Sequence, residues 1–204
     1  MCARGLLFTV LAVAATITAC SSSEAGTPRA TTSANESTAT TSTGLPIPPR
    51  PRTLSMNRVD PCSILTEQQQ AEFAFDRPPL GTEGTSGPLK DERGCSYRSS
   101  TEEYGTLIIP SLAVGLTEYL KQIRDNSTRR VITISGFPAI QEEQQLNLGP
   151  GNDRCFVDVD VADDQMLAVQ FGQVASSKPL PMETLCAKAV EVAEAALTTL
   201  QGQR

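Results

Sequence analysis

The first 57 residues limit what this chain can fold into, because they contain no segment that could build a packed core. An apolar run over residues 6–17 is too short to span a bilayer. Residues 21–43 then hold 13 Ser or Thr in 23 positions, and residues 46–51 are rich in proline. Such sequences bury too little apolar surface to offset the entropy of ordering. Of 204 residues, this leaves residues 58–204 for a single domain.

A targeting motif ends the apolar run. Residues 17–20 read Ile-Thr-Ala-Cys and resemble the bacterial lipobox. The resemblance implies that residues 1–19 are a lipoprotein signal peptide and that the mature chain begins at Cys20, which carries a diacylglycerol thioether and an amide-linked acyl chain such as palmitate. We therefore expect a lipid anchor on the extracytoplasmic face of the cell membrane, with residues 20–57 as a disordered tether. The alternative is a plain secretory signal in which Cys20 is incidental.

The clearest strand signal lies over residues 155–161, where apolar and acidic residues alternate. This period of two predicts a strand with one face in the core and with Asp158 and Asp160 pointing away from it. A turn at residues 163–164 leads to a return strand over residues 167–171. Further strands are predicted at 95–100 and 104–109, as a hairpin, and over 130–140, as one strand broken at Gly-Phe-Pro or as two strands.

Helical spacing predicts three helices. Residues 181–201 place their apolar residues on one stripe, which predicts a long C-terminal helix. Shorter helices are predicted at 66–74, which starts with a capping-box spacing, and at about 115–125. Residues 77–93 are expected to form a loop without an element of its own. The predicted fold class is α+β: a single domain in which an antiparallel sheet packs against helices.

Four cysteines remain in the predicted domain: Cys62, Cys95, Cys155 and Cys186. An even number in an exported chain predicts two disulfides, and the wide spacing lacks the C-x₂₋₄-C unit of a zinc site. Cys155 lies on the inward face of a predicted strand and Cys186 on the inward face of the last helix. We therefore favour Cys155 with Cys186 and Cys62 with Cys95, while the other two pairings stay open.

Several segments together resemble a known family. They are residues 60–66 (Asp-Pro-Cys-Ser-Ile-Leu-Thr), 94–97 (Gly-Cys-Ser-Tyr), 136–139 (Gly-Phe-Pro-Ala) and 155–159 (Cys-Phe-Val-Asp-Val), followed by Cys186 on an Ala-rich helix. In this order they resemble the actinobacterial lipoprotein family known as domain of unknown function 3558 (DUF3558), over essentially all of residues 60–200. Tyr97 stands where that family is expected to have Trp. The resemblance implies a cell-envelope lipoprotein and supplies no catalytic residues.

Composition excludes several classes of function. The chain has no His, which excludes a Ser-His-Asp triad and a His-ligated zinc. It has no G-x-S-x-G or S-x-x-K motif, and we expect neither a metal nor a cofactor. The net charge of −6 argues against nucleic acid as a partner. Residues 58–204 carry 13 positive and 21 negative side chains, so we expect this domain to favour a basic protein partner over anionic lipid headgroups.

Acidic residues are the remaining candidates for chemistry. Two groups are clustered: Asp158, Asp160, Asp163 and Asp164, which suggest Ca²⁺ ligands, and the pairs Glu102-Glu103 and Glu142-Glu143, which suggest glycosidase acids. We interpret both groups as surface residues, because the aspartates lack EF-hand spacing and the glutamates lie in polar runs. The sequence therefore predicts a non-catalytic envelope module that binds a protein, glycan or lipid. The alternative is a cell-wall hydrolase that uses acidic residues.

Overall fold

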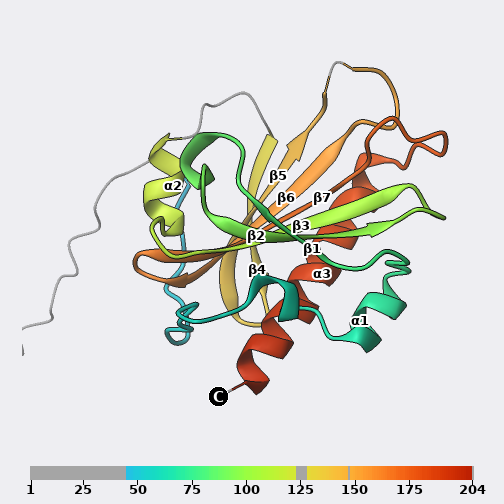
Figure 1. The fold of residues 1–204 in the computed structure, drawn as a ribbon. Coiled ribbons are helices and arrows are strands. Elements are labelled where there is room, and N and C mark those ends of the chain that lie inside the picture. The colour runs from blue at the N-terminus through green and yellow to red at the C-terminus, as the bar shows by residue number, and fades with distance from the viewer. Residues whose placement is uncertain (1–44, 123–127, 147, 204) are drawn as a thin grey trace, which may run out of the picture. The chain divides into compact units, whose positions relative to one another are not determined.

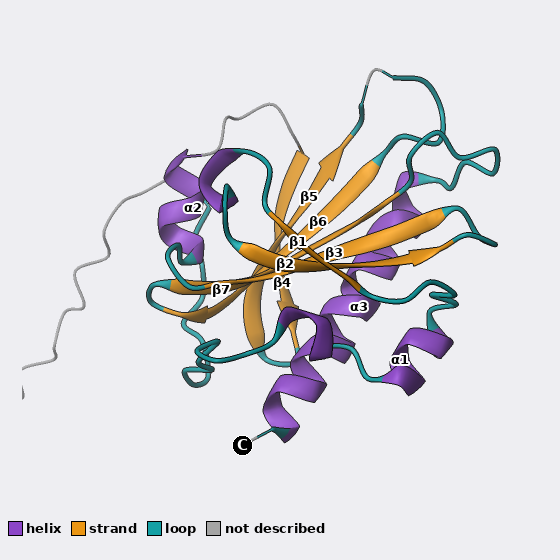
Figure 2. Cartoon of the chain, viewed as in Figure 1, coloured by secondary structure: helices purple, strands orange, loops and turns teal. Residues whose placement is uncertain are grey.

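The fold is seen in a computed structural model that describes residues 45–122, 128–146 and 148–203. Seven strands form one antiparallel sheet in the order β1-β2-β3-β7-β6-β5-β4 (Figures 1 and 2). The strands are β1 Leu80–Glu83, β2 Arg93–Ser99, β3 Tyr104–Ser111, β4 Thr128–Ile134, β5 Phe137–Gln144, β6 Arg154–Ala162 and β7 Gln165–Gly172. The helices are α1 Glu67–Glu72, α2 Leu116–Gln122 and α3 Met182–Gly202, with short 3₁₀ turns at Pro61–Ser63 (η1) and Gly87–Leu89 (η2). The predicted α+β class is confirmed.

Helix α3 covers one face of the sheet and forms the main core with it (Figure 1). The stripe of small and aliphatic residues that predicts this helix is the buried stripe, from Leu185 to Leu200. It packs on β6 and β7, where Val157 and Val169 are fully buried. Small side chains such as Ala193 let the helix approach the sheet closely, as dense core packing requires.

Two disulfides fasten elements to this core, and both favoured pairings are confirmed. Cys155 on β6 is bonded to Cys186 on α3, with the Cα atoms 5.0 Å apart. Cys62 in η1 is bonded to Cys95 on β2, with the Cα atoms 5.1 Å apart. The first bond joins helix to sheet at the centre of the domain, and the second holds the first turn of the domain against the opposite half of the sheet.

The predicted boundary at residue 58 is wrong, because residues 45–57 pack on the domain instead of extending as a tether. Leu54 and Met56 are each 1% exposed and belong to the main core. Arg50 bonds to Asp160 on β6 at 2.8 Å. A segment with few apolar residues can be ordered when each of them fills a position on an existing core, and its prolines reduce the entropy that ordering costs. Residues 1–44, which include the predicted signal peptide, Cys20 and most of the predicted tether, lie outside the described residues.

Most predicted elements are confirmed, and one loop is corrected. Helix α1 begins with the predicted capping box of Thr66 and Gln69. Residues 128–144 form two strands, β4 and β5, joined by a tight turn at Ser135 and Gly136. Residues 77–93 are not a plain loop, since they contain β1 and η2. Strand β1 is short, largely exposed and bonded to β2 through its backbone, so its side chains give no alternation to detect.

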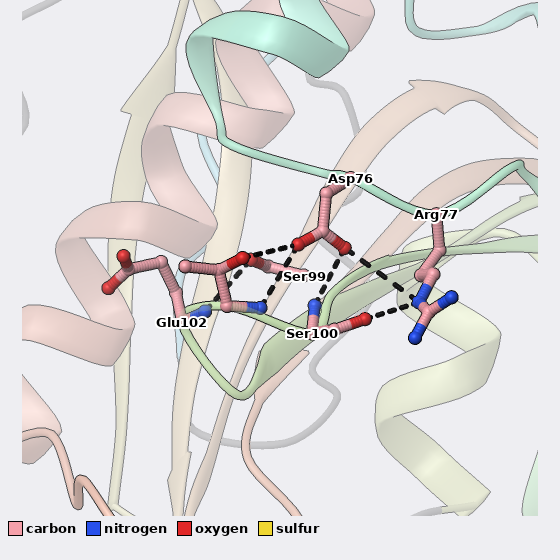
Figure 3. A network of polar contacts seen from close by, with 6 residues as sticks. Asp76, Arg77, Ser99, Ser100 and Glu102 are labelled. Carbon is pink, nitrogen blue, oxygen red and sulfur yellow. Dashed lines mark hydrogen bonds and ion pairs between the residues drawn. The ribbon is translucent and has the colours of Figure 1, made fainter.

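A polar network fixes the turn between β2 and β3 to the segment that follows α1 (Figure 3). Asp76 accepts hydrogen bonds from the backbone N–H groups of Ser100, at 2.8 Å, and Thr101, at 3.0 Å. These bonds, with Ser100 contributing most, hold the pKa of Asp76 well below its ordinary value. Arg77 bonds to the Ser100 hydroxyl, and Glu102 stays on the surface as predicted.

Among the described residues, no helix is long and apolar enough to cross a membrane.

Candidate functional site

The sheet face opposite α3, here called the cleft face, carries three rows of side chains set by the strand register. The first row is Ile140, Asp158, Ala168 and Ile109; the second is Glu142, Phe156, Gln170 and Leu107; the third is Gln144, Arg154, Gly172, Gly105 and Arg98. Residues in a row lie directly opposite one another on adjacent strands. The face is therefore apolar along part of the first two rows and becomes polar and basic in the third.

A cavity of about 460 Å³, here called the sheet cleft, opens on the first two rows. The strands form its floor, and residues 84–89 and helix α2 form its walls, with Tyr119 and Gln122 contributed by the helix. Apolar side chains from Leu107, Ile109 and Phe156 line much of it. A concave, partly apolar cavity with a few polar groups is the usual setting for a small ligand.

Asp158 is the most unusual residue of the cleft. Its side chain is buried, at 1% exposure, and neither carboxyl oxygen has a hydrogen-bond partner among the described residues. Burial raises the pKa of Asp158 to about 8, the nearby Glu142 raises it further, and Arg129 opposes the shift. At neutral pH the group is therefore mostly a neutral carboxylic acid, which can donate one hydrogen bond and accept others.

An ion pair lies next to Asp158. Arg129 on β4 faces Glu142 on β5 in the strand register, and the Arg129 Nε donates a hydrogen bond of 2.6 Å to the Glu142 carboxylate. Both side chains are nearly buried, at 11% and 12% exposure. Glu142 is also a diagonal neighbour of Asp158 across the strands. At the alkaline pH where a tyrosine titrates, Asp158 is ionised, and its charge together with burial raises the pKa of Tyr119, so the phenol keeps its proton. The cleft thus offers a neutral acid, a phenol and an ion pair above an apolar floor.

The prediction that Asp158 and Glu142 are surface residues is wrong. The alternation correctly places Asp158 away from α3, but helix α2 and the partly buried Leu45 and Ile47 cover this second face. The sequence held a signal for this covering in residues 166–169, Met-Leu-Ala-Val, whose apolar residues occupy both faces of β7. A strand with two apolar faces is buried on both sides, so acids on the neighbouring strand are buried too.

The other predicted acidic sites remain apart from the cleft. Asp160 is half-buried and paired with Arg50, while Asp163 and Asp164 are exposed in the turn between β6 and β7. Glu103 is bound by the hydroxyls of Ser176 and Ser177. No group of three or more His, Cys, Asp or Glu in the part of the chain that the structure describes is placed to hold a metal ion.

Comparison with known proteins places the chain in a family without adding a function. The family described as "Protein of unknown function (DUF3558)" matches residues 15–199, almost the whole chain. Neither the curated proteins nor the solved structures gave a match.

Proposed function

The chain belongs to the DUF3558 family, whose description names no activity. From the geometry of the sheet cleft we propose that the protein is a non-catalytic module that binds a small ligand there. The observation that carries the proposal is the buried Asp158 carboxyl on the floor of a cavity of about 460 Å³, since neither of its oxygens has a hydrogen-bond partner among the described residues. An unsatisfied buried polar group costs stability, so its presence in a fold calls for a role. A ligand acceptor in the cleft that displaces the side chains covering Asp158 would supply the missing partner.

The lining limits the chemistry of this ligand. Leu107, Ile109 and Phe156 favour an apolar body, and the neutral acid of Asp158 favours a carbonyl, ester or hydroxyl oxygen near the first row. The cavity volume admits a small molecule or one segment of a larger lipid or glycolipid. These features favour a lipid or a glycan derivative as the ligand, rather than a folded protein.

The proposal includes a lipid anchor at Cys20 and a position on the extracytoplasmic face of the cell membrane. Its support is the Ile-Thr-Ala-Cys motif of residues 17–20 together with the two disulfides, since such bonds persist in oxidising compartments. The tether that follows the anchor ends by residue 45, where the described chain packs on the domain.

The anchor is tested by replacing Cys20. We expect mass spectrometry of the membrane fraction to find a mature chain that begins at an acylated Cys20, because the thioether forms on that sulfur. The Cys20→Ala chain should be released or left unprocessed, whereas the Ser21→Ala chain should behave as the wild type. An unmodified Cys20, or a mature chain that begins at another residue, would contradict the prediction.

Ligand binding is tested with N-phenylnaphthylamine, an uncharged probe that fluoresces in apolar sites. We expect saturable binding of one probe per full-length chain. Ala168→Phe should weaken binding by about tenfold or more, because the added ring would occupy the cleft floor and displace apolar contacts with the probe. Leu89→Asp places a charge on the half-buried cleft wall and should have a similar effect without altering the sheet.

The matched control is Ala187→Phe, which makes the same change at an exposed position of α3 on the opposite side of the sheet. Its affinity for the probe should equal that of the wild type. Equal affinity in all three variants, with folding confirmed by circular dichroism, would show that the probe binds elsewhere and would contradict the proposal.

A second candidate function is hydrolysis assisted by acids, and the proximity of Asp158 to Glu142 favours it. A carboxyl with a pKa of about 8 keeps its proton and is able to act as a general acid. Against this candidate, Arg129 already binds the Glu142 carboxylate that a two-acid mechanism would need. Turnover of peptidoglycan or another glycan that is lost in both Asp158→Asn and Glu142→Gln, but not in Glu102→Gln, would replace the binding proposal with an enzyme.

A further inference from the structure

Two arginines lie in a hollow of about 410 Å³ at the third row of the cleft face. Arg98 on β2 is exposed and Arg154 on β6 is half-buried, and neither guanidinium has an ion pair or hydrogen bond among the described residues. The acidic side chain of this hollow, Glu103, is bound by Ser176 and Ser177. Two cations therefore share one concave surface, and neither is paired with an acidic side chain in the part of the chain that the structure describes.

The backbone brings these two arginines together. Arg98 faces Gly105, Gly105 faces Gly172, and Gly172 faces Arg154 across four adjacent strands. A Cβ on Gly105 would lie 3.1 Å from the Arg98 Cγ, and one on Gly172 would lie 2.7 Å from the Arg154 Cγ. Each arginine stem thus lies over the glycine beside it, and the two stems lean toward each other. Their Cα atoms are three strand spacings apart, about 14 Å, which leaves room between them for a small group.

The hollow is continuous with the sheet cleft, because both are lined by Leu107, Arg154 and Gln170. Arg154 and Asp158 lie on the same face of β6, four residues apart, so their Cα atoms are about 13 Å apart. Between them the second row offers the apolar side chains of Phe156 and Leu107. The cleft face therefore presents a hydrogen-bonding acid, an apolar surface and a pair of cations in one line.

We infer that Arg98 and Arg154 form a binding site for an oxyanion, a carboxylate or a phosphate, carried by the same ligand whose apolar body occupies the sheet cleft. The inference rests on the proposed function and names the chemical class of its ligand: an anionic amphiphile about one nanometre long. The net charge of −6 does not oppose this site, since salt screens charges more than about 8 Å away at physiological ionic strength. Guanidinium groups bind carboxylates and phosphates through two hydrogen bonds at once.

The test compares two probes that differ only in a sulfonate. Anilinonaphthalene sulfonate is N-phenylnaphthylamine with one added sulfonate group. The ratio of the two affinities for the full-length chain therefore measures how much the anion contributes to binding. Arg98→Gln and Arg154→Gln should each weaken binding of the sulfonate probe by about tenfold, the loss expected for one charged hydrogen bond. Binding of the uncharged probe should change by less than about twofold.

The control is Arg52→Gln, which removes the same charge from an exposed arginine outside both cavities. It should leave both affinities unchanged, and Arg154→Lys should keep only part of the sulfonate affinity, because the charge remains but the two parallel hydrogen bonds of the guanidinium are lost. If the arginine variants leave the ratio unchanged, or weaken both probes equally in a folded protein, the inference is overturned while the cleft proposal stands. If the wild type binds neither probe, the proposed function fails and this inference fails with it.

Displacement of the sulfonate probe distinguishes a carboxylate from a phosphate as the head group of the ligand. Dodecanoate, dodecyl phosphate and dodecanol share one apolar body and differ in the head group. We expect dodecanoate or dodecyl phosphate to compete at least about tenfold better than dodecanol, and the stronger of the two identifies the head group. Equal competition by dodecanol would overturn the inference, because the arginines would then contribute nothing to recognition.

Discussion

Loss of the Cys155–Cys186 disulfide should lower the free energy of unfolding by about 3–4 kcal/mol, the chain entropy released by opening a loop of this length. The two cysteines are 31 residues apart in sequence and are 0% and 2% exposed. Replacing both with Ala also removes sulfur atoms from the contact between β6 and α3, which adds a cavity term to the entropic one. For a domain of about 150 residues the loss corresponds to a fall in melting temperature of roughly 10 °C.

The Cys62–Cys95 bond provides the comparison, because it spans 33 residues and has nearly the same chain entropy. Cys62 is half-buried in the short turn η1, so its replacement leaves less unfilled core. Urea denaturation of the two double-Ala variants should therefore show a larger loss for the Cys155 and Cys186 pair. A larger loss for the Cys62 and Cys95 pair would mean that the contact of α3 with the sheet is not the principal tie of the domain.

Asp158→Asn should stabilise the protein at alkaline pH and leave its stability unchanged near pH 4. The pKa of Asp158 is about 8 in the folded protein and 3.8 for an ordinary aspartate. Between these values the unfolded chain releases a proton that the folded chain keeps, so the stability of the wild type falls as pH rises from about 4 to about 8. A shift of this size corresponds to at most about 5 kcal/mol at pH 8. Asn does not titrate, so the variant avoids this loss.

Urea denaturation across this pH range measures the difference between variant and wild type, in which the titration of all other groups cancels. The matched change Asp164→Asn, in the exposed turn between β6 and β7, should give a difference that does not depend on pH. A constant difference for Asp158→Asn would mean that the carboxyl is ionised and stabilised in the fold. A gain in stability on replacing a buried carboxyl with an amide is typical of positions kept for binding, at a cost to the fold.

Local patterns in the sequence determined the elements that form the main core. The period of two over residues 155–161 and the helical stripe of residues 181–201 are strong signals, because one face of each element is buried along its whole length. These two patterns also favoured the Cys155–Cys186 pairing, since each places one cysteine on an inward face. The hairpin of β2 and β3 and the capping box of α1 likewise depend on residues that are close in sequence.

The candidate site depended on the tertiary structure, because alternation tells which side chains share a face but not what covers that face. The burial of Asp158 follows from the packing of α2 and residues 45–47 over the sheet, which the alternation over residues 155–161 does not encode. Arg98 and Arg154 come together only because β3 pairs with β7, a contact between strands far apart in the chain. The sequence by itself thus determined most of the elements and the faces that pack in the main core. The order of the strands and the covering of the second face decided the cleft, its neutral acid and its pair of arginines.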